Sequence, residues 1–353
     1  MEYRTCGESG PTVSALGLGC WAFGGGEYWG RQSQEDVNKV VRRSFEVGIT
    51  LYDTAEAYNE GRSEESLGTA IAGLPRDEVR VCTKIAPSAA YRELVEKHCD
   101  DSLRRLGTDY IDLYLLHWPV TPHSLRHFTK DENKIVNPPH IAETMAAFED
   151  LQAKGKILHF GVSNFGHDPL QAATAASQRI AANQVPYNLL ARAAELETIP
   201  YCVDKGIGLI GYFALLQGIL TGKYQTFSEI PATRRRTRHF DSAGNDMARH
   251  GEPGAEAETA AALDSLRSLA GETGHTMTEL SVAWALSRPG IASMLVGART
   301  VEQLEGTLRA SKLRLDATVL RRLDELSKPV LHALGPSMDY YESIENDRTS
   351  GSA

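Results

Sequence analysis

The stretch Leu51-Tyr-Asp-Thr-Ala-Glu-Ala-Tyr58 marks the end of a buried strand that runs into a polar loop. Ile49 to Tyr52 form the expected strand, and the loop carries Asp53 and Tyr58. A buried charge is costly unless it is paired, so a carboxylate at a strand end fills a core poorly. The same carboxylate, with a phenol five residues further on, suits a functional site.

Two later strands end in the same way. The runs Val79-Arg-Val-Cys-Thr-Lys84 and Ile111-Asp-Leu-Tyr-Leu-Leu-His117 each finish on one ionisable side chain. Asp53 and Lys84 are 31 residues apart, and Lys84 and His117 are 33 apart, close to the roughly 30 residues of one strand–helix–strand unit. Consecutive parallel strands place their carboxyl ends on the same side of a sheet. These ionisable side chains and the phenol are therefore expected to converge on one face.

Composition excludes several classes of protein. The chain has 353 residues, is 42% hydrophobic and carries a net charge of −9, so it can bury a large core but lacks the basic balance of a general nucleic-acid binder. Five cysteines without a C-x-x-C pair predict a reduced, cytoplasmic protein. No apolar signal segment and no run of about 18 apolar residues is present, so no membrane contact is expected.

Apolar strands alternate with helical segments along almost the whole chain. The eight expected strands span residues 13–18, 49–53, 79–85, 110–117, 157–163, 180–186, 207–212 and 292–296. Strict alternation of strands that are buried on both faces indicates a parallel sheet. Eight units predict a closed (β/α)8 barrel with its site at the carboxyl strand ends. An open doubly wound sheet is the alternative.

The remaining segments complete a single domain over residues 1–353, with a core of about 13–328. A small hairpin is expected at 3–10, long irregular loops at 119–140 and 223–257, and a polar C-terminal tail at 329–353. The expected helices span residues 33–47, 63–72, 91–106, 141–154, 168–178, 190–206, 258–272, 276–287, 301–310 and 316–327. The glycine-rich segment at 17–26 is not a G-x-G-x-x-G fingerprint.

Seven motifs occur in the order and spacing of one known family. They are Asp53-Thr-Ala-Glu-Ala-Tyr58, Thr83-Lys84, Leu115-Leu-His-Trp118, Gly161-Val-Ser-Asn-Phe165, Asn183-Gln-Val-Pro-Tyr-Asn188, Gln217-Gly-Ile-Leu-Thr-Gly-Lys223 and Gly297-Ala-Arg-Thr-Val-Glu-Gln-Leu304. From Gly17 to about Ala310 the chain resembles an aldo-keto reductase, in the branch with bacterial sugar and inositol-type reductases and potassium-channel β subunits. The resemblance implies a (β/α)8 TIM barrel and a nicotinamide cofactor, usually NADPH.

The resemblance also assigns catalytic roles. Tyr58 would give a proton to a carbonyl oxygen, and Lys84 would stabilise the phenolate and lower its pKa. Asp53 would keep Lys84 charged, and His117 would orient the carbonyl. In a purely structural reading, Asp53 and Lys84 form an ordinary ion pair and His117 is a core histidine. No zinc-type motif accompanies Asp53 and His117, so no metal is expected.

Cofactor positions follow from the same resemblance. Ser163, Asn164 and Gln184 match the residues that hold the nicotinamide carboxamide, and Tyr212 matches the aromatic that stacks on its ring. The segment 213–218 would approach the pyrophosphate through backbone N–H groups. The further candidates are Cys20, Trp21, Asp53, Phe213, Ala214, Leu215, Gln217, Gly218 and Gly297.

Several cations are candidates for the cofactor phosphates. Arg299 corresponds to the usual contact of the 2′-phosphate, which favours NADPH over NADH, and Gln303 fits the adenine end. Lys223 and the arginine run Arg234, Arg235, Arg236 and Arg238 are further candidates; the alternative for the run is a solvated charged loop. Two departures from the family stand out: Phe213-Ala214 replaces Ser-Pro, and Gly306-Thr307 replaces Glu-Asn.

Aromatic side chains from the loops 20–31, 118–140 and 224–257 are expected around a substrate. The candidate substrate residues are Trp21, Tyr28, Trp29, Tyr58, His117, Trp118 and Phe128. Such walls suit sugars, aryl ketones and polyketide-like ligands equally. The alternative is that the aromatic residues only pack the loops.

The sequence therefore predicts an NADP(H)-dependent oxidoreductase for a small aldehyde, ketone or alcohol, with NADH less expected. A redox-sensing regulatory subunit is one alternative, but the resemblance implies that the channel subunits lack a histidine at the position of His117. An NADP-assisted dehydration or epimerisation is the other. The sequence does not determine whether the protein forms a homo-oligomer.

Overall fold

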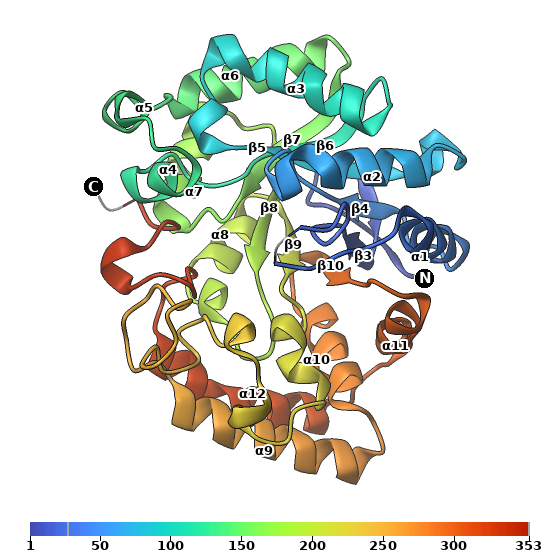
Figure 1. The fold of residues 1–353 in the computed structure, drawn as a ribbon, viewed down its shortest axis with the longest axis vertical. Helices are drawn as coiled ribbons and strands as arrows, with labels where there is room; N and C mark the ends of the chain where they lie inside the picture. Colours follow the sequence, from blue (N-terminus) through green and yellow to red (C-terminus); the bar gives the residue numbers. More distant parts are fainter. Residues whose placement is uncertain (27, 352–353) are drawn as a thin grey trace.

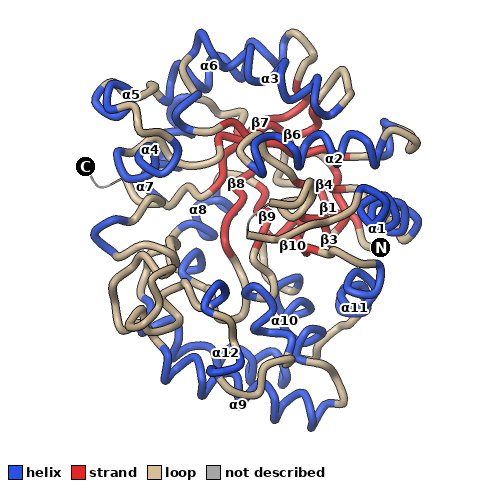
Figure 2. Tube along the Cα trace, in the orientation of Figure 1, coloured by secondary structure: helices blue, strands red, loops and turns tan. Residues whose placement is uncertain are grey.

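Eight parallel strands close into a barrel in the computed structural model, which describes residues 1–26 and 28–351. Hydrogen bonds run from each strand to the next, and β10 returns to β3 (Figures 1 and 2). The strands are β3 Leu16–Gly19, β4 Leu51–Asp53, β5 Arg80–Ile85, β6 Ile111–Leu116, β7 Ile157–Ser163, β8 Ile180–Pro186, β9 Gly208–Tyr212 and β10 Ile291–Gly297. The predicted closed (β/α)8 barrel is confirmed, and an open sheet is excluded.

Helices surround this barrel, with α9 and α12 packed together as additional elements beyond it (Figure 1). The helices are α1 Gln34–Glu46, α2 Arg62–Ile71, α3 Arg92–Leu106, α6 Ile141–Ala153, α7 His167–Ala176, α8 Thr198–Asp204, α9 Glu256–Thr273, α10 Met277–Leu286, α11 Val301–Lys312 and α12 Ala317–Leu334. The helix expected at 190–206 was too long. Oδ1 of Asn188 accepts the N–H groups of Leu190 and Ala191, and this turn holds the chain out of a helix.

The expected strand at 13–18 is two elements. β2 (Thr12–Ser14) pairs antiparallel with β1 (Tyr3–Thr5), so the N-terminal hairpin extends beyond residue 10. The Ser14 hydroxyl donates to the Leu16 carbonyl and accepts the Thr50 N–H, which kinks the chain before β3. Cys6 and Val13 of the hairpin region are buried in one cluster with barrel residues such as Leu51.

The loop expected to be irregular at 119–140 contains two short helices, α4 (Pro122–Phe128) and α5 (Glu132–Val136). Thr121 and Ser124 form a capping box at the start of α4, where Pro122 fits the first turn. Short helices of this kind show too few residues for a helical period to be visible in the sequence.

The segment 329–353, expected as a polar tail, is packed against the rest of the fold in its described part. α12 continues through Pro329 to Leu334, and Met338 and Tyr340 after it are buried. The backbone of Thr349 accepts the N–H of Gly166. In Figure 1 the red segment after α12 climbs to a point beside α4 and α7.

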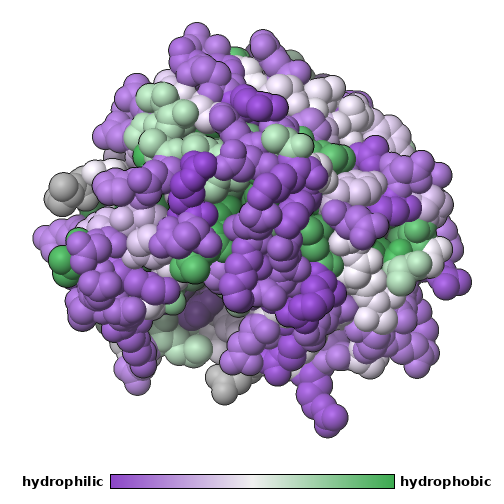
Figure 3. Space-filling model, turned by 90° about the horizontal axis from the view of Figure 1, so that it is seen from above, coloured by the Kyte–Doolittle hydropathy of each residue, from purple (hydrophilic) through white to green (hydrophobic). Residues whose placement is uncertain are grey.

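Polar side chains cover most of the face seen from above, with apolar residues showing mainly between them (Figure 3). Among the described residues, no helix combines the length and the apolar character that a membrane span requires.

Candidate active site

Asp53 and Lys84 meet at the carboxyl ends of β4 and β5. The Lys84 Nζ lies 2.8 Å from Oδ1 and 2.9 Å from Oδ2 of Asp53, and it donates a further hydrogen bond of 2.7 Å to the Thr54 carbonyl. Lys84 is fully buried. Burial is the largest single effect and lowers the pKa of Lys84, but the attractions of Asp53, Tyr58 and Cys82 together outweigh it, so the net pKa is raised and the ammonium is kept.

Tyr58 lies above this ion pair, with the Lys84 Nζ 5.0 Å from its ring centroid. Three hydrogen bonds between side chains of its loop and the backbone of neighbouring loops hold this loop in place. Asn59 adopts φ of 50° and donates from Nδ2 to the carbonyls of Trp21 and Phe23. Glu56 accepts the Ala86 N–H at 2.8 Å. The loop that carries the phenol is thus bonded to both neighbouring loops.

Burial raises the pKa of Tyr58 to about 12, and the nearby Lys84 lowers it only in part. From the sequence, Lys84 was expected to bring this pKa down toward neutrality. Lys84 acts in the expected direction, but loss of solvation of the phenolate is the larger effect. Tyr58 is consequently protonated at neutral pH.

His117 follows β6 and completes the group. Its ring meets that of Tyr58 edge-on, with centroids 5.5 Å apart. Burial, with Lys84 nearby, lowers the pKa of His117 well below its usual value, so the imidazole is neutral. Nδ1 is buried without a hydrogen-bond partner among the described residues. A buried lone pair costs less than a buried unpaired N–H, which places the proton on Nε2, where it can serve a ligand.

The residues predicted to hold a carboxamide lie directly beside this group. Ser163 donates from Oγ to the Gln184 carbonyl at 3.0 Å. Asn164 donates from Nδ2 to the His117 carbonyl at 2.9 Å and accepts the Tyr212 hydroxyl at 2.7 Å. Gln184 donates from Nε2 to Asp53 at 2.7 Å. The predicted catalytic and carboxamide residues therefore form one connected network.

The segment 213–218 has an unusual backbone. Phe213, Leu216 and Gln217 have φ of 70°, 47° and 54°, and Gly218 has φ of 93°. The N–H groups of Leu216 and Gly218 are bonded within the turn, to the carbonyls of Phe213 and Leu215 at 2.9 and 2.8 Å. A Cβ added at Gly218 would lie 3.0 Å from the Lys223 Nζ, so the predicted cation lies against this turn.

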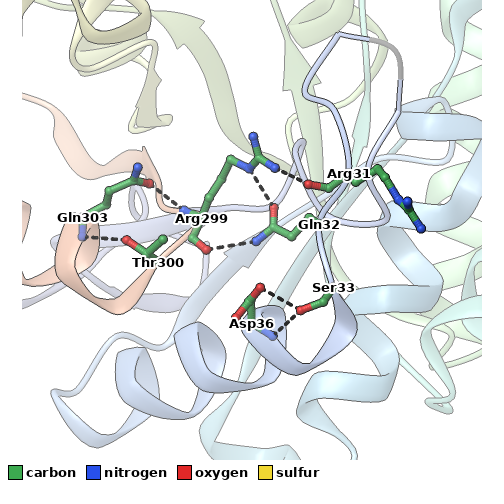
Figure 4. A pocket seen from close by; sticks show the side chains of 7 residues that line it. All are labelled: Arg31, Gln32, Ser33, Asp36, Arg299, Thr300 and Gln303. Atoms are coloured by element: carbon green, nitrogen blue, oxygen red, sulfur yellow. Dashed lines mark hydrogen bonds between the residues drawn. The ribbon is translucent and has the colours of Figure 1, made fainter.

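A cavity of about 550 Å³ lies further along the same side of the barrel (Figure 4). Its lining residues are Arg31, Gln32, Ser33, Asp36, Arg299, Thr300 and Gln303. The Arg299 guanidinium donates to the carbonyls of Trp29 and Arg31 and to Oε1 of Gln32. Gly297 is the exposed last residue of β10 and directly precedes the segment that carries Arg299.

The aromatic candidates also cluster. Trp21 and Tyr28 stack with centroids 5.4 Å apart, and Trp29 meets Trp21 edge-on at 5.3 Å. Trp21 lies 5.9 Å from Tyr58. Phe128 of α4 lies 5.7 Å from His117, so Trp21 and Phe128 both border the catalytic group.

The arginine run is divided between several tasks. Arg234 lies over the rings of Tyr28 and Trp29, at 4.8 and 4.6 Å. Arg238 is buried, and its guanidinium donates to backbone carbonyls of the C-terminal segment, including that of Leu334 at 2.8 Å. Arg238 is therefore taken up within the fold, and neither the phosphate interpretation nor the solvated-loop interpretation describes it.

The model of the Aldo/keto reductase family matches residues 15–328. The chain belongs to the aldo/keto reductase family.

Among its relatives, the aldo-keto reductase YhdN of Bacillus subtilis is 34% identical, over 86% of this chain and 87% of that protein. The NADH-specific methylglyoxal reductase of Escherichia coli is 31% identical, over 92% of this chain and 99% of that one. An aldo/keto reductase from Klebsiella pneumoniae, solved with NADP and acetate, is 27% identical with a TM-score of 0.68, over 98% of this chain and all of that chain.

The donor set of this aldo/keto reductase fits a nicotinamide dinucleotide. Amide and hydroxyl groups of Ser163, Asn164 and Gln184 suit a carboxamide, which both donates and accepts hydrogen bonds. The ammonium of Lys223, which lies against the turn at 213–218, suits a pyrophosphate, and the cavity beside Arg299 is lined by polar and charged groups. At Gly306, no described atom outside its chain neighbours and the adjacent backbone of its own helix lies within 4 Å of the point where a Cβ would stand, so the loss of the usual side chain leaves open space.

Residues of the C-terminal segment also lie near the carboxyl ends of the barrel strands, and no pattern in the sequence predicted them there. Arg348 lies 4.2 Å above the Trp118 ring and forms a buried ion pair with Asp339. Tyr341 accepts a hydrogen bond from Gln217 at 2.6 Å. The one signal was the Tyr340-Tyr341 pair, since aromatic residues are unusual in a solvated tail. Arg31 and Asp36 were also missed, because nothing local marks them as cavity residues.

Proposed function

We propose that this chain is an NADP(H)-dependent oxidoreductase that reduces an aldehyde or ketone to an alcohol, or runs the reverse reaction. The observation that carries the proposal is the meeting of the Tyr58 phenol, the Lys84 ammonium and the His117 imidazole beside Ser163, Asn164 and Gln184. When bound, the cofactor supplies or accepts the hydride at the carbonyl carbon. The protein must then supply or accept the proton at the oxygen.

The side chains divide this task. His117 is neutral and donates from Nε2 to the carbonyl oxygen, which orients the substrate. Tyr58 is protonated at neutral pH and gives its proton to that oxygen. Lys84 stabilises the resulting phenolate, and Asp53 keeps the ammonium in place.

Arg299 and the polar cavity beside it support a preference for NADPH, because a guanidinium matches a phosphate well. The relative described as NADH-specific makes a direct comparison of both cofactors necessary. The first experiment is a titration of the purified protein with NADPH and with NADH, followed by intrinsic fluorescence, since Trp21 and Trp29 border the site. We expect tight NADPH binding and weak NADH binding. Binding of neither cofactor would end the proposal.

The chemical role is tested with Tyr58→Phe, which keeps the ring but removes the proton. We expect NADPH binding to be retained and carbonyl reduction to fall by about two orders of magnitude or more, in line with general acid catalysis. Full activity of Tyr58→Phe would exclude this acid. Cofactor binding without turnover of any carbonyl compound would favour a regulatory subunit, and turnover without accumulation of NADP⁺ would favour a dehydration or epimerisation.

A further inference from the structure

Gln184 connects the two halves of the site through different atoms. It lies on β8, with 2% of its surface exposed. Its backbone carbonyl accepts hydrogen bonds from the Ser163 Oγ and the Asn164 N–H, at 3.0 and 2.8 Å. Its side-chain Nε2 lies 2.7 Å from Oδ1 of Asp53. One residue thus touches both the carboxamide pair and the ion pair that supports Tyr58.

The side chain of Gln184 has a defined orientation. An ionised carboxylate only accepts hydrogen bonds, so the amide must turn its NH₂ group toward Asp53. Oε1 of Gln184 then faces away, and no described residue donates to it. A carboxamide brings an N–H donor, and Oε1 is the acceptor that this network leaves open.

Asp53 receives donors from two sides. Lys84 donates to both carboxylate oxygens, while Gln184 donates to Oδ1 alone. The ammonium also donates to the Thr54 carbonyl, so its three N–H groups face three acceptors. Rotation of the Asp53 carboxylate would redirect the ammonium. Gln184 holds Oδ1 of Asp53 as a second donor and so restrains that rotation.

We propose that Gln184, which the family resemblance already assigns to the carboxamide, is also a positioning residue: its Nε2 holds Asp53 and thereby couples the cofactor pocket to the proton donor. The coupling to the carboxamide rests on the proposed function, whereas the bond to Asp53 does not. Binding at Oε1 polarises the amide and strengthens the Nε2–H bond to Asp53. Asp53, Lys84 and Tyr58 are therefore held most rigidly when the carboxamide is bound.

The bond to Asp53 is tested without cofactor or substrate, by thermal unfolding of four variants between about pH 5 and pH 8. These are Gln184→Met, Gln184→Glu, Asp53→Asn and the double variant Gln184→Glu/Asp53→Asn. Gln184→Glu places two carboxylates at hydrogen-bond distance, which raises the pKa of the pair above its unfolded value. Its stability deficit is therefore full at pH 8 and shrinks toward pH 5, where the pair can share a proton.

The double variant is the decisive arm. The amide that it carries at position 53 can donate to the carboxylate that it carries at position 184. We therefore expect it to recover at least half of the midpoint temperature that Gln184→Glu loses at pH 8. Asn183→Asp is the matched control, because Asn183 is buried on the same strand but donates to the Phe165 carbonyl instead. Asp53→Asn should not rescue that control. Purely additive losses in the Gln184 cycle would overturn the proposal.

The coupling is tested by NADPH titration and by kcat of the milder variant. We expect Gln184→Met to weaken NADPH binding about tenfold and to lower kcat about tenfold at saturating cofactor, because both arms of the amide are lost. A tenfold loss of affinity with unchanged kcat would overturn the coupling and leave a simple binding contact. If the thermal cycle shows rescue but no nicotinamide cofactor binds, the proposed function fails while the bond to Asp53 stands.

Discussion

Arg348→Ala is predicted to release the C-terminal segment from the mouth of the barrel. Arg348 is 3% exposed and its partner Asp339 is 1% exposed. The guanidinium donates from Nε to Oδ2 at 2.6 Å and from Nη2 to Oδ1 at 2.8 Å, and its Cζ lies 4.2 Å above the Trp118 ring. Truncation leaves Asp339 as a buried carboxylate without its cation.

The magnitude follows from this burial. Removing one partner of a buried ion pair costs about 3–5 kcal/mol, because the remaining charge stays desolvated. The backbone N–H groups of Tyr341 and Arg348, which also reach Asp339, offset part of that cost. If the segment detaches, the loss of stability cannot exceed the free energy of this local opening. The larger effect is therefore expected in residues 336–350 and the smaller one in the barrel.

The assay combines hydrogen exchange with thermal unfolding. Backbone protection in 336–350 should fall by about two orders of magnitude or more, since about 1.4 kcal/mol corresponds to a factor of ten. The matched control is Arg309→Ala, whose ion pair with Glu279 is formed by a 64% exposed side chain and should contribute less than about 1 kcal/mol. Equal behaviour of the two variants would refute the reasoning. A raised KM for carbonyl substrates should accompany the release, because Trp118 directly follows His117.

Three further predictions concern the pocket. The rate of carbonyl reduction should be flat from about pH 6 to 9, because burial keeps His117 neutral and holds the pKa of Tyr58 at about 12; a pH profile of kcat with a step near 6.5, the ordinary pKa of histidine, would contradict this. Arg299→Ala should weaken NADPH binding about tenfold or more and leave NADH binding unchanged, and equal losses in the two fluorescence titrations would argue against a 2′-phosphate contact. Asn188→Ala should lower the free energy of unfolding by about 3 kcal/mol, because it orphans two buried N–H groups; denaturant unfolding tests this against the exposed Asn346→Ala, and equal losses would be inconsistent.

The local pattern of the sequence determined the barrel. Each strand is a short apolar run between helical segments, and parallel strands that are buried on both faces leave few architectures. The same repeat determined that Asp53, Lys84 and His117 converge, because parallel strands end at one edge. Boundaries were less well predicted where side chains override the local pattern, as Ser14 and Asn188 do.

Only the tertiary structure shows how the C-terminal segment packs against the strand ends and which side chains of the site are charged. Arg348 reaches Trp118 across most of the chain, and no local periodicity marks such a pair. The pKa of Tyr58 depends on burial against the attraction of Lys84, and only the packed structure shows that burial is larger. The bond from Gln184 to Asp53 joins strands 131 residues apart. Sequence spacing specifies which strand ends meet, but burial and hydrogen-bond geometry arise only once the whole barrel has packed.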